Sequence, residues 1–342
     1  MIKEYLRNNI KSLILISITT VATIIGLSIW CVRIGEPIFK SILAVSAVSP
    51  YLFFYLALMF NSPMEHLHKH LKERPFDIFY LGAALMLPYF LYCLASQTFH
   101  WLGLIKLLAL MLGTIFFASM AAKNHYGKWA WYDLALVIWI WIPFDLRLLN
   151  HTWLWPPGDA EYAINTLFAL TIVSPLYIYL RGLPKVGLPL RFQENDLKTI
   201  GLYTNAYTAV AVPLGFLTAF LAWNPQTNLG SWFSQPLGIF FFIAIPEELL
   251  FRGIFLSYLE DKIKTKHVPL ILSSILFGLS HLNNPPLWDW RYLMMSSLAG
   301  IAYGLAFMRS RNLLAPVIIH TIVDYVWVQF LLTEELMHYS GQ

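Results

Sequence analysis

An apolar run near residues 236–257 carries charged side chains that could do chemistry, namely Glu247, Glu248 and Arg252. In an α-helix, Glu248 and Arg252 are four residues apart and lie on one face, close enough to form an ion pair, whereas Glu247 points elsewhere. The two carboxylates then have different environments, which is how a site separates a structural acid from a general base. Pro246 removes a backbone hydrogen bond just before the pair and is expected to kink the helix there.

Two histidines follow in later apolar runs. Phe277 and His281 are four residues apart, and so are His320 and Asp324, so each pair lies on one helical face and Asp324 can orient the His320 ring. With one glutamate, the two imidazoles could activate a water molecule and polarise a carbonyl. Glu247, His281 and His320 could equally hold a divalent metal such as zinc, and their spacing leaves both possibilities open.

The composition places these runs in a membrane. The chain has 342 residues, of which 58% are hydrophobic and only 12% charged, against about 25% charged residues in ordinary globular proteins. So few charges cannot cover a water-facing surface of this size, which excludes a soluble enzyme and a disordered chain. The net charge of +4 is spread over short connectors, which argues against a nucleic-acid partner.

The apolar runs predict an all-α, polytopic transmembrane helix bundle. Since about 20 apolar residues cross a bilayer, we expect about eleven spans, or nine to eleven if the short fifth and ninth are re-entrant. They lie near residues 12–32, 41–60, 77–96, 101–121, 132–146, 162–180, 200–222, 236–257, 268–282, 292–308 and 313–332. Lysines and arginines concentrate in alternate connectors, which predicts a cytoplasmic N-terminus. We expect an integral protein of a bacterial inner (plasma) membrane.

The longest polar connector, residues 181–198, divides the chain in two. We expect an N-terminal transmembrane region over residues 1–198, with about six spans, and a C-terminal core over residues 199–342. The motifs with chemical potential fall within residues 235–330 of that core.

Two smaller features are expected to contact the membrane surface and not to take part in chemistry. Four tryptophans near span ends are expected to anchor the chain at the membrane interface, namely Trp153, Trp155, Trp288 and Trp290. The histidines of the alternating cluster His66, His68 and His70 lie beside lysines in a cytoplasmic connector, which favours a loop facing lipid headgroups over a metal site.

Taken in order, the three motifs resemble a known family of intramembrane proteases. This is the CPBP family (CAAX proteases and bacteriocin-processing enzymes), also called Abi, which includes the type II CAAX prenyl endopeptidases. The matching residues are Glu247-Glu248-x-x-x-Arg252, Phe277-x-x-x-His281 and His320-x-x-x-Asp324. The resemblance covers roughly residues 235–330 of the chain.

The resemblance implies a role for each of four residues. Glu247 and His281 would activate water, and His320 and Asp324 would hold the oxyanion. An ionised aspartate would repel an oxyanion, so Asp324 is either protonated or acts by orienting His320. The family has been described both as metalloproteases and as metal-independent glutamate proteases.

We therefore predict an intramembrane endopeptidase that cuts a membrane-tethered protein, either lipidated or membrane-spanning, within the lipid bilayer. Glu248, Arg252 and Phe277 would support the geometry of its site. One alternative is a proton-coupled transporter or channel that uses the same residues as a relay. The other is a non-catalytic membrane scaffold. No inverted repeat of the charged motifs appears in the first six predicted spans, which weighs against a transporter.

Overall fold

The structure is a computed structural model. It describes residues 2–58, 77–156, 160–174, 181–183, 186, 188, 190–265, 267–284 and 286–333. Within these ranges every regular element is a helix, which confirms the predicted all-α helix bundle. His66, His68 and His70 lie outside the described residues.

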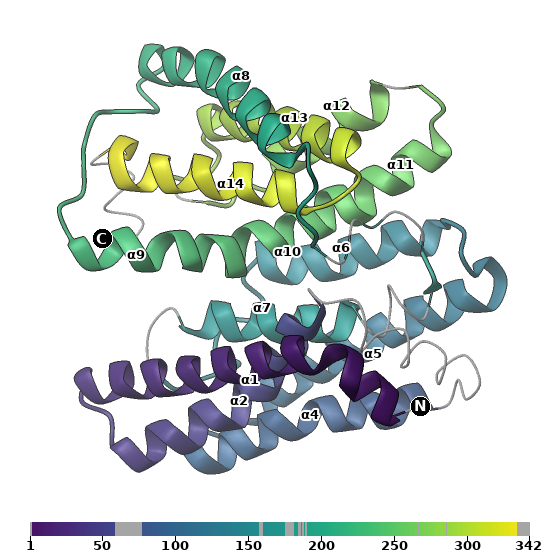
Figure 1. The fold of residues 1–342 in the computed structure, drawn as a ribbon, viewed down its shortest axis with the longest axis vertical. Coiled ribbons are helices and arrows are strands. Elements are labelled where there is room, and N and C mark those ends of the chain that lie inside the picture. Colours follow the sequence, from purple (N-terminus) through teal and green to yellow (C-terminus); the bar gives the residue numbers. More distant parts are fainter. Residues whose placement is uncertain are drawn as a thin grey trace. The chain divides into compact units, whose positions relative to one another are not determined.

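The chain forms two compact units, residues 1–184 and residues 185–342, and the boundary falls inside the long polar connector. Figure 1 shows the helices of each unit. The first unit contains α1 (Ile2–Arg33), α2 (Ile38–Leu58), α4 (Asp77–Ser96), α5 (Trp101–His125), α6 (Trp131–Asp145) and α7 (Ala160–Val173).

The connector after α6 folds back into the core of the first unit instead of resting at a membrane interface. Trp153 is only 2% exposed and Trp155 only 3%. The Trp153 ring lies edge-on to Tyr89 and Tyr92, with centroids 5.1 Å and 5.0 Å away, and its indole nitrogen donates to Asn165 Oδ1 at 2.9 Å. A buried indole needs such a partner. The prediction that these two tryptophans are interfacial anchors is therefore wrong.

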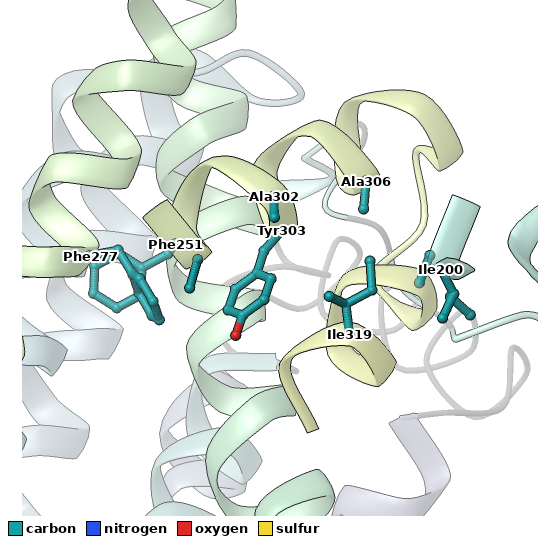
Figure 2. Packing of buried hydrophobic residues seen from close by; sticks show 9 residues of the cluster. Ile200, Phe251, Phe277, Ala302, Tyr303, Ala306 and Ile319 are labelled. Carbon is teal, nitrogen blue, oxygen red and sulfur yellow. The ribbon is translucent and has the colours of Figure 1, made fainter. Parts of the chain in front are cut away.

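The second unit is built around α13 (Trp290–Ser310), which packs against α8 (Asp196–Leu217), α12 (Val268–Leu279) and α14 (Leu314–Val326). Its remaining elements are α9 (Leu229–Gly238), the π-helices η2 (Ile239–Ala244) and η3 (Leu249–Leu256), α10 (Ile245–Glu248), α11 (Ser257–Lys262) and the π-helix η4 (Trp327–Leu331). Figure 2 shows an apolar core built by α8, η3, α12, α13 and α14, whose members include Phe251, Phe277, Tyr303 and Ile319.

Glycines allow α12 and α13 to approach closely. A Cβ atom at Gly278 would lie 2.6 Å from the backbone oxygen of Leu293, and one at Gly300 would lie 3.0 Å from the Cα of Ser274. Both distances are shorter than ordinary van der Waals contact. The two helices that flank the predicted site are therefore held at a spacing that larger residues would disturb.

Six of the described helices are long and apolar enough to cross a membrane. They are Ile10–Arg33, Ile38–Ala57, Asp77–Ser96, Trp101–Lys123, Asp196–Leu217 and Leu314–Leu331. Within the described residues, the other predicted spans also overlap helical segments, and the part of span 162–180 beyond residue 174 lies outside the described residues. The total number of crossings and the side of the N-terminus stay predictions.

Candidate active site

The segment that carries the glutamate pair changes its helical winding. The single α-helical turn α10, which contains Pro246, lies between the π-helices η2 and η3. The backbone N–H of Ile245 donates to the carbonyl of Phe240, five residues earlier, and Pro246 has no N–H to donate. Instead of a simple kink, the structure shows α10 between two wider π-helical segments. Such segments are rare in proteins, and those that occur are often found at functional sites.

Glu248 and Arg252 form the ion pair that their spacing predicts. Nη1 of Arg252 donates to Oε1 of Glu248 at 2.8 Å, and both side chains are fully buried. Nη2 of Arg252 donates to the carbonyl of Gly300 at 3.3 Å. The guanidinium carbon lies 4.2 Å from the centre of the Phe277 ring, which gives Phe277 its supporting contact. This pair fixes α12 and α13 to the helix of the glutamates.

The His320 ring lies among three carboxylates. Nδ1 of His320 is 2.9 Å from Oε1 of Glu248, while Nε2 is 3.3 Å from Oδ2 of Asp324 and 3.8 Å from Oε2 of Glu247. The ring is only 2% exposed. A ring with a proton on each nitrogen would donate to Glu248 on one side and to Asp324 on the other. The structure thus brings residues of α10 and α14 into direct contact.

Glu247 has a different environment from Glu248. Its side chain is 26% exposed, whereas that of Glu248 is fully buried. The Oε2 atom of Glu247 is enclosed but accepts no hydrogen bond from any residue that the structure describes. The two acids are therefore distinct, one neutralised by a guanidinium and one with an oxygen free to accept a proton.

His281 contacts the other site residues through the ring of Phe277. Its Nδ1 lies 2.8 Å from the backbone oxygen of Phe277, so the neutral ring donates there and keeps a lone pair on Nε2. The Phe277 ring lies 4.8 Å from the His281 ring and 5.8 Å from the His320 ring. Within the described ranges, no hydrogen bond or ion pair joins His281 to Glu247.

A cavity of about 240 Å³ opens beside these side chains, large enough for several water molecules or one substrate side chain. His281, His320 and Asp324 supply its ionisable groups. Mostly apolar and aromatic side chains of α8, α13, α14 and η4 form the rest, together with the hydroxyl groups of Thr204, Thr208 and Ser296. Glu247 is not part of this lining and approaches it through the His320 ring. A mostly apolar cavity with a few converging polar groups is the usual form of a substrate site.

The residues proposed for a metal do not fit one. Glu247, His281 and His320 would have to turn free lone pairs toward one point. Both nitrogens of His320 face carboxylates, so this ring turns no free lone pair toward Glu247 and His281. Among the described residues, no group of three His, Cys, Asp or Glu side chains is placed to hold a metal ion.

Comparison with known proteins finds a family match over part of the chain. Residues 229–326 match the family model of type II CAAX prenyl endopeptidase Rce1-like proteins. The chain carries an Rce1-like segment. This match confirms the resemblance to CAAX-type proteases over that segment, and its range includes every site residue predicted from the sequence. No curated protein and no solved structure shows a significant match to the chain.

The motifs do not indicate one residue of the site, Tyr303. Its ring stacks on that of His320 with centroids 4.7 Å apart and an angle of 16° between the planes. The sequence does contain a weak signal, because Tyr303 is a large polar residue beside Gly304 in a helix otherwise suited to close packing.

Proposed function

We propose that this integral membrane protein is an intramembrane endopeptidase of the glutamate type. It cuts a membrane-tethered protein close to its lipid or transmembrane anchor, in a bacterial inner membrane. The observation that carries the proposal is Oε2 of Glu247, which accepts no hydrogen bond from the described residues and lies 3.8 Å from Nε2 of His320 in a site enclosed by apolar helices. A carboxylate without a hydrogen bond is costly at such a position, and a catalytic use would explain why it is there.

In the proposed reaction, Glu247 removes a proton from a water molecule that has entered the site, and Nε2 of His281 helps by accepting a hydrogen bond from that water. The water oxygen then bonds to the carbonyl carbon of the scissile peptide, and the carbonyl electrons move onto its oxygen. When the tetrahedral intermediate collapses, the C–N bond breaks and the proton passes to the leaving amine. The positive charge of His320 stabilises the oxyanion electrostatically.

Glu248, Arg252 and Asp324 position the reacting groups in this scheme. Glu248 joins the Arg252 guanidinium to the His320 ring through a single oxygen atom, Oε1. Asp324, from the opposite edge of the ring, holds Nε2 at 3.3 Å. An aspartate in this place orients His320, which removes the difficulty that a carboxylate would repel an oxyanion.

The proposal is tested with the purified full chain in liposomes and a library of internally quenched, lipid-anchored peptides. Wild type is expected to cleave members of the library, and His281→Ala to lose that activity. His267→Ala is the matched control, because His267 is exposed and precedes the same helix, α12, at its other end. A chelator is expected to leave the rate unchanged. Undiminished cleavage by His281→Ala would contradict the proposed water activation.

A further inference from the structure

An oxyanion needs hydrogen-bond donors, and the motif residues have none to spare. Both nitrogens of His320 face carboxylates, Glu248 on one side and Asp324 on the other. The Nδ1 of His281 faces the carbonyl of Phe277, so the neutral ring turns a lone pair to the cavity. The charge of His320 can therefore stabilise the oxyanion, but none of the motif residues has a free N–H or O–H group to donate a hydrogen bond to it.

Tyr303 has a hydroxyl group that is not otherwise used. The residue is only 1% exposed, and no hydrogen bond of its hydroxyl is found within the part of the chain that the structure describes. Its oxygen is not among the fully enclosed polar atoms that lack a partner, so it stays open to the space beside it. Tyr303 lines the same cavity as His281 and His320. Figure 2 shows its oxygen at the end of the ring that is farthest from the backbone of α13.

Contacts from three other helical segments fix the plane of the Tyr303 ring. The ring stacks on His320, with centroids 4.7 Å apart. The guanidinium carbon of Arg252 lies 5.1 Å from its centre, and Phe277 meets it edge-on at 6.0 Å. A hydroxyl on a ring held in this way is preorganised, so it loses little freedom when it donates to a developing charge.

We propose that Tyr303 is a catalytic residue whose hydroxyl donates a hydrogen bond to the oxyanion of the tetrahedral intermediate. The inference rests on the proposed function, since it assigns a donor to that reaction. No proton is transferred in this step: the phenol keeps its hydrogen, and the bond is strongest while the carbonyl oxygen carries negative charge. The benefit therefore falls on the transition state and not on substrate binding.

Two other tyrosines line the cavity and serve as comparisons. Tyr207 of α8 and Tyr292 of α13 are only partly buried. The hydroxyl of Tyr292 already accepts from Nδ2 of Asn284 at 3.4 Å, and its ring lies beside His281, 5.1 Å away. The stacking on His320 distinguishes Tyr303.

The test removes the hydroxyl and keeps the ring. The full-length Tyr303→Phe variant is reconstituted in liposomes, and cleavage of the best-cleaved lipid-anchored peptide of the library is measured. We expect kcat to fall by roughly 10²-fold, the effect of losing one oxyanion donor, with little change in KM. The melting temperature should stay the same or rise, because the lost hydroxyl has no hydrogen bond in the free protein. Tyr203→Phe is the matched control, since Tyr203 packs on the same core but does not line the cavity.

Three results would overturn the inference while the proposed function stands. They are a wild-type kcat in Tyr303→Phe, a loss of kcat that appears only in Tyr207→Phe or Tyr292→Phe, and a loss that comes with a lower melting temperature. If wild type cleaves no peptide, or if Glu247→Gln cleaves at the wild-type rate, the proposed function itself fails and the role of Tyr303 fails with it.

Discussion

The two units of the molecule each contain a buried arginine–carboxylate pair, and the pairs differ in what surrounds them. In the first unit Arg181 pairs with Asp133 at 2.9 Å, and both side chains are fully inaccessible. In the second unit Arg252 pairs with Glu248 at 2.8 Å, again with almost no exposure. Burial and pairing alone therefore do not separate a structural pair from one that serves a reaction.

The first pair is closed by hydrogen bonds. Besides both oxygens of Asp133, Arg181 donates to three backbone carbonyls, those of Ala121, His125 and Lys128. The second oxygen of Asp133 also accepts from the backbone of Ala130. Such a network ties the chain after α7 to the connector between α5 and α6. The polar groups of this pair therefore find their partners within the chain and need no ligand.

The second pair is incomplete. Nε of Arg252 and Oε2 of Glu248 have no hydrogen-bond partner among the described residues, and Oε2 of the neighbouring Glu247 has none either. Glu248 also holds the His320 ring, which lines a cavity. Buried polar atoms are normally paired, so three unpaired ones next to a ring that lines a cavity mark the second pair as part of a site. The first pair is satisfied by its own chain, whereas the second holds a histidine that can meet a ligand.

The largest expected effect on stability comes from the closed pair. Asp133→Asn keeps the shape of the side chain but leaves Arg181 charged and uncompensated, which should lower the free energy of unfolding by about 3 kcal/mol. Turnover per folded molecule should not change, because the pair belongs to the first unit and neither residue lines the cavity. Chemical unfolding in detergent and peptide cleavage measure the two quantities. A selective loss of turnover would contradict the structural role.

The matched change in the incomplete pair is Glu248→Gln. Stability should fall as well, but turnover per folded molecule should drop by roughly 10²-fold, because the charge that holds His320 is lost. The assay is cleavage normalised to folded protein. If Glu248→Gln and Asp133→Asn had the same turnover, the distinction between the two pairs would fail.

Helix spacing near the incomplete pair gives a smaller effect. Gly278→Ala places a Cβ 2.6 Å from the carbonyl of Leu293, so α12 and α13 must separate, at a cost of about 1–3 kcal/mol. Gly201→Ala in α8 is the control, because nothing lies within 4 Å of its added Cβ. That variant should be neutral or slightly stabilising. Thermal unfolding compares them, and equal stability of the two variants would show that α12 and α13 can adjust freely.

The smallest expected effect is that of Asp324→Asn. The amide oxygen can still accept from Nε2 of His320, so the ring stays oriented, but the charge is gone. A neutral hydrogen bond in place of a charged one should lower turnover by roughly 10-fold, while Asp324→Leu should lower it further. The ratio of the two rates measures how much of the role is orientation. A higher rate for Asp324→Leu than for Asp324→Asn would exclude it.

Contacts local in sequence could be predicted, and distant ones could not. The apolar runs predict the helices, and the spacing of four residues predicts both the Glu248–Arg252 pair and the approach of Asp324 to His320. The bond between Glu248 and His320 joins residues 72 positions apart and depends on how the helices pack. The sequence shows no sign of that packing.

Arg181 illustrates the same limit. The sequence places it in a polar cytoplasmic connector, where a solvated side chain is the ordinary expectation. The structure buries it completely, because Asp133 and three carbonyls from a segment about 50 residues earlier supply its partners. The winding of η2 and η3 also escapes the sequence, since α- and π-helical turns share one apolar pattern.

The central claim is that Glu247 activates the attacking water. The most direct test is Glu247→Gln in the full chain, assayed for peptide cleavage in liposomes beside its melting temperature. The account predicts that cleavage is lost while the melting temperature is kept, because Oε2 of Glu247 has no hydrogen bond to lose. Cleavage at the wild-type rate by a folded Glu247→Gln protein would contradict it.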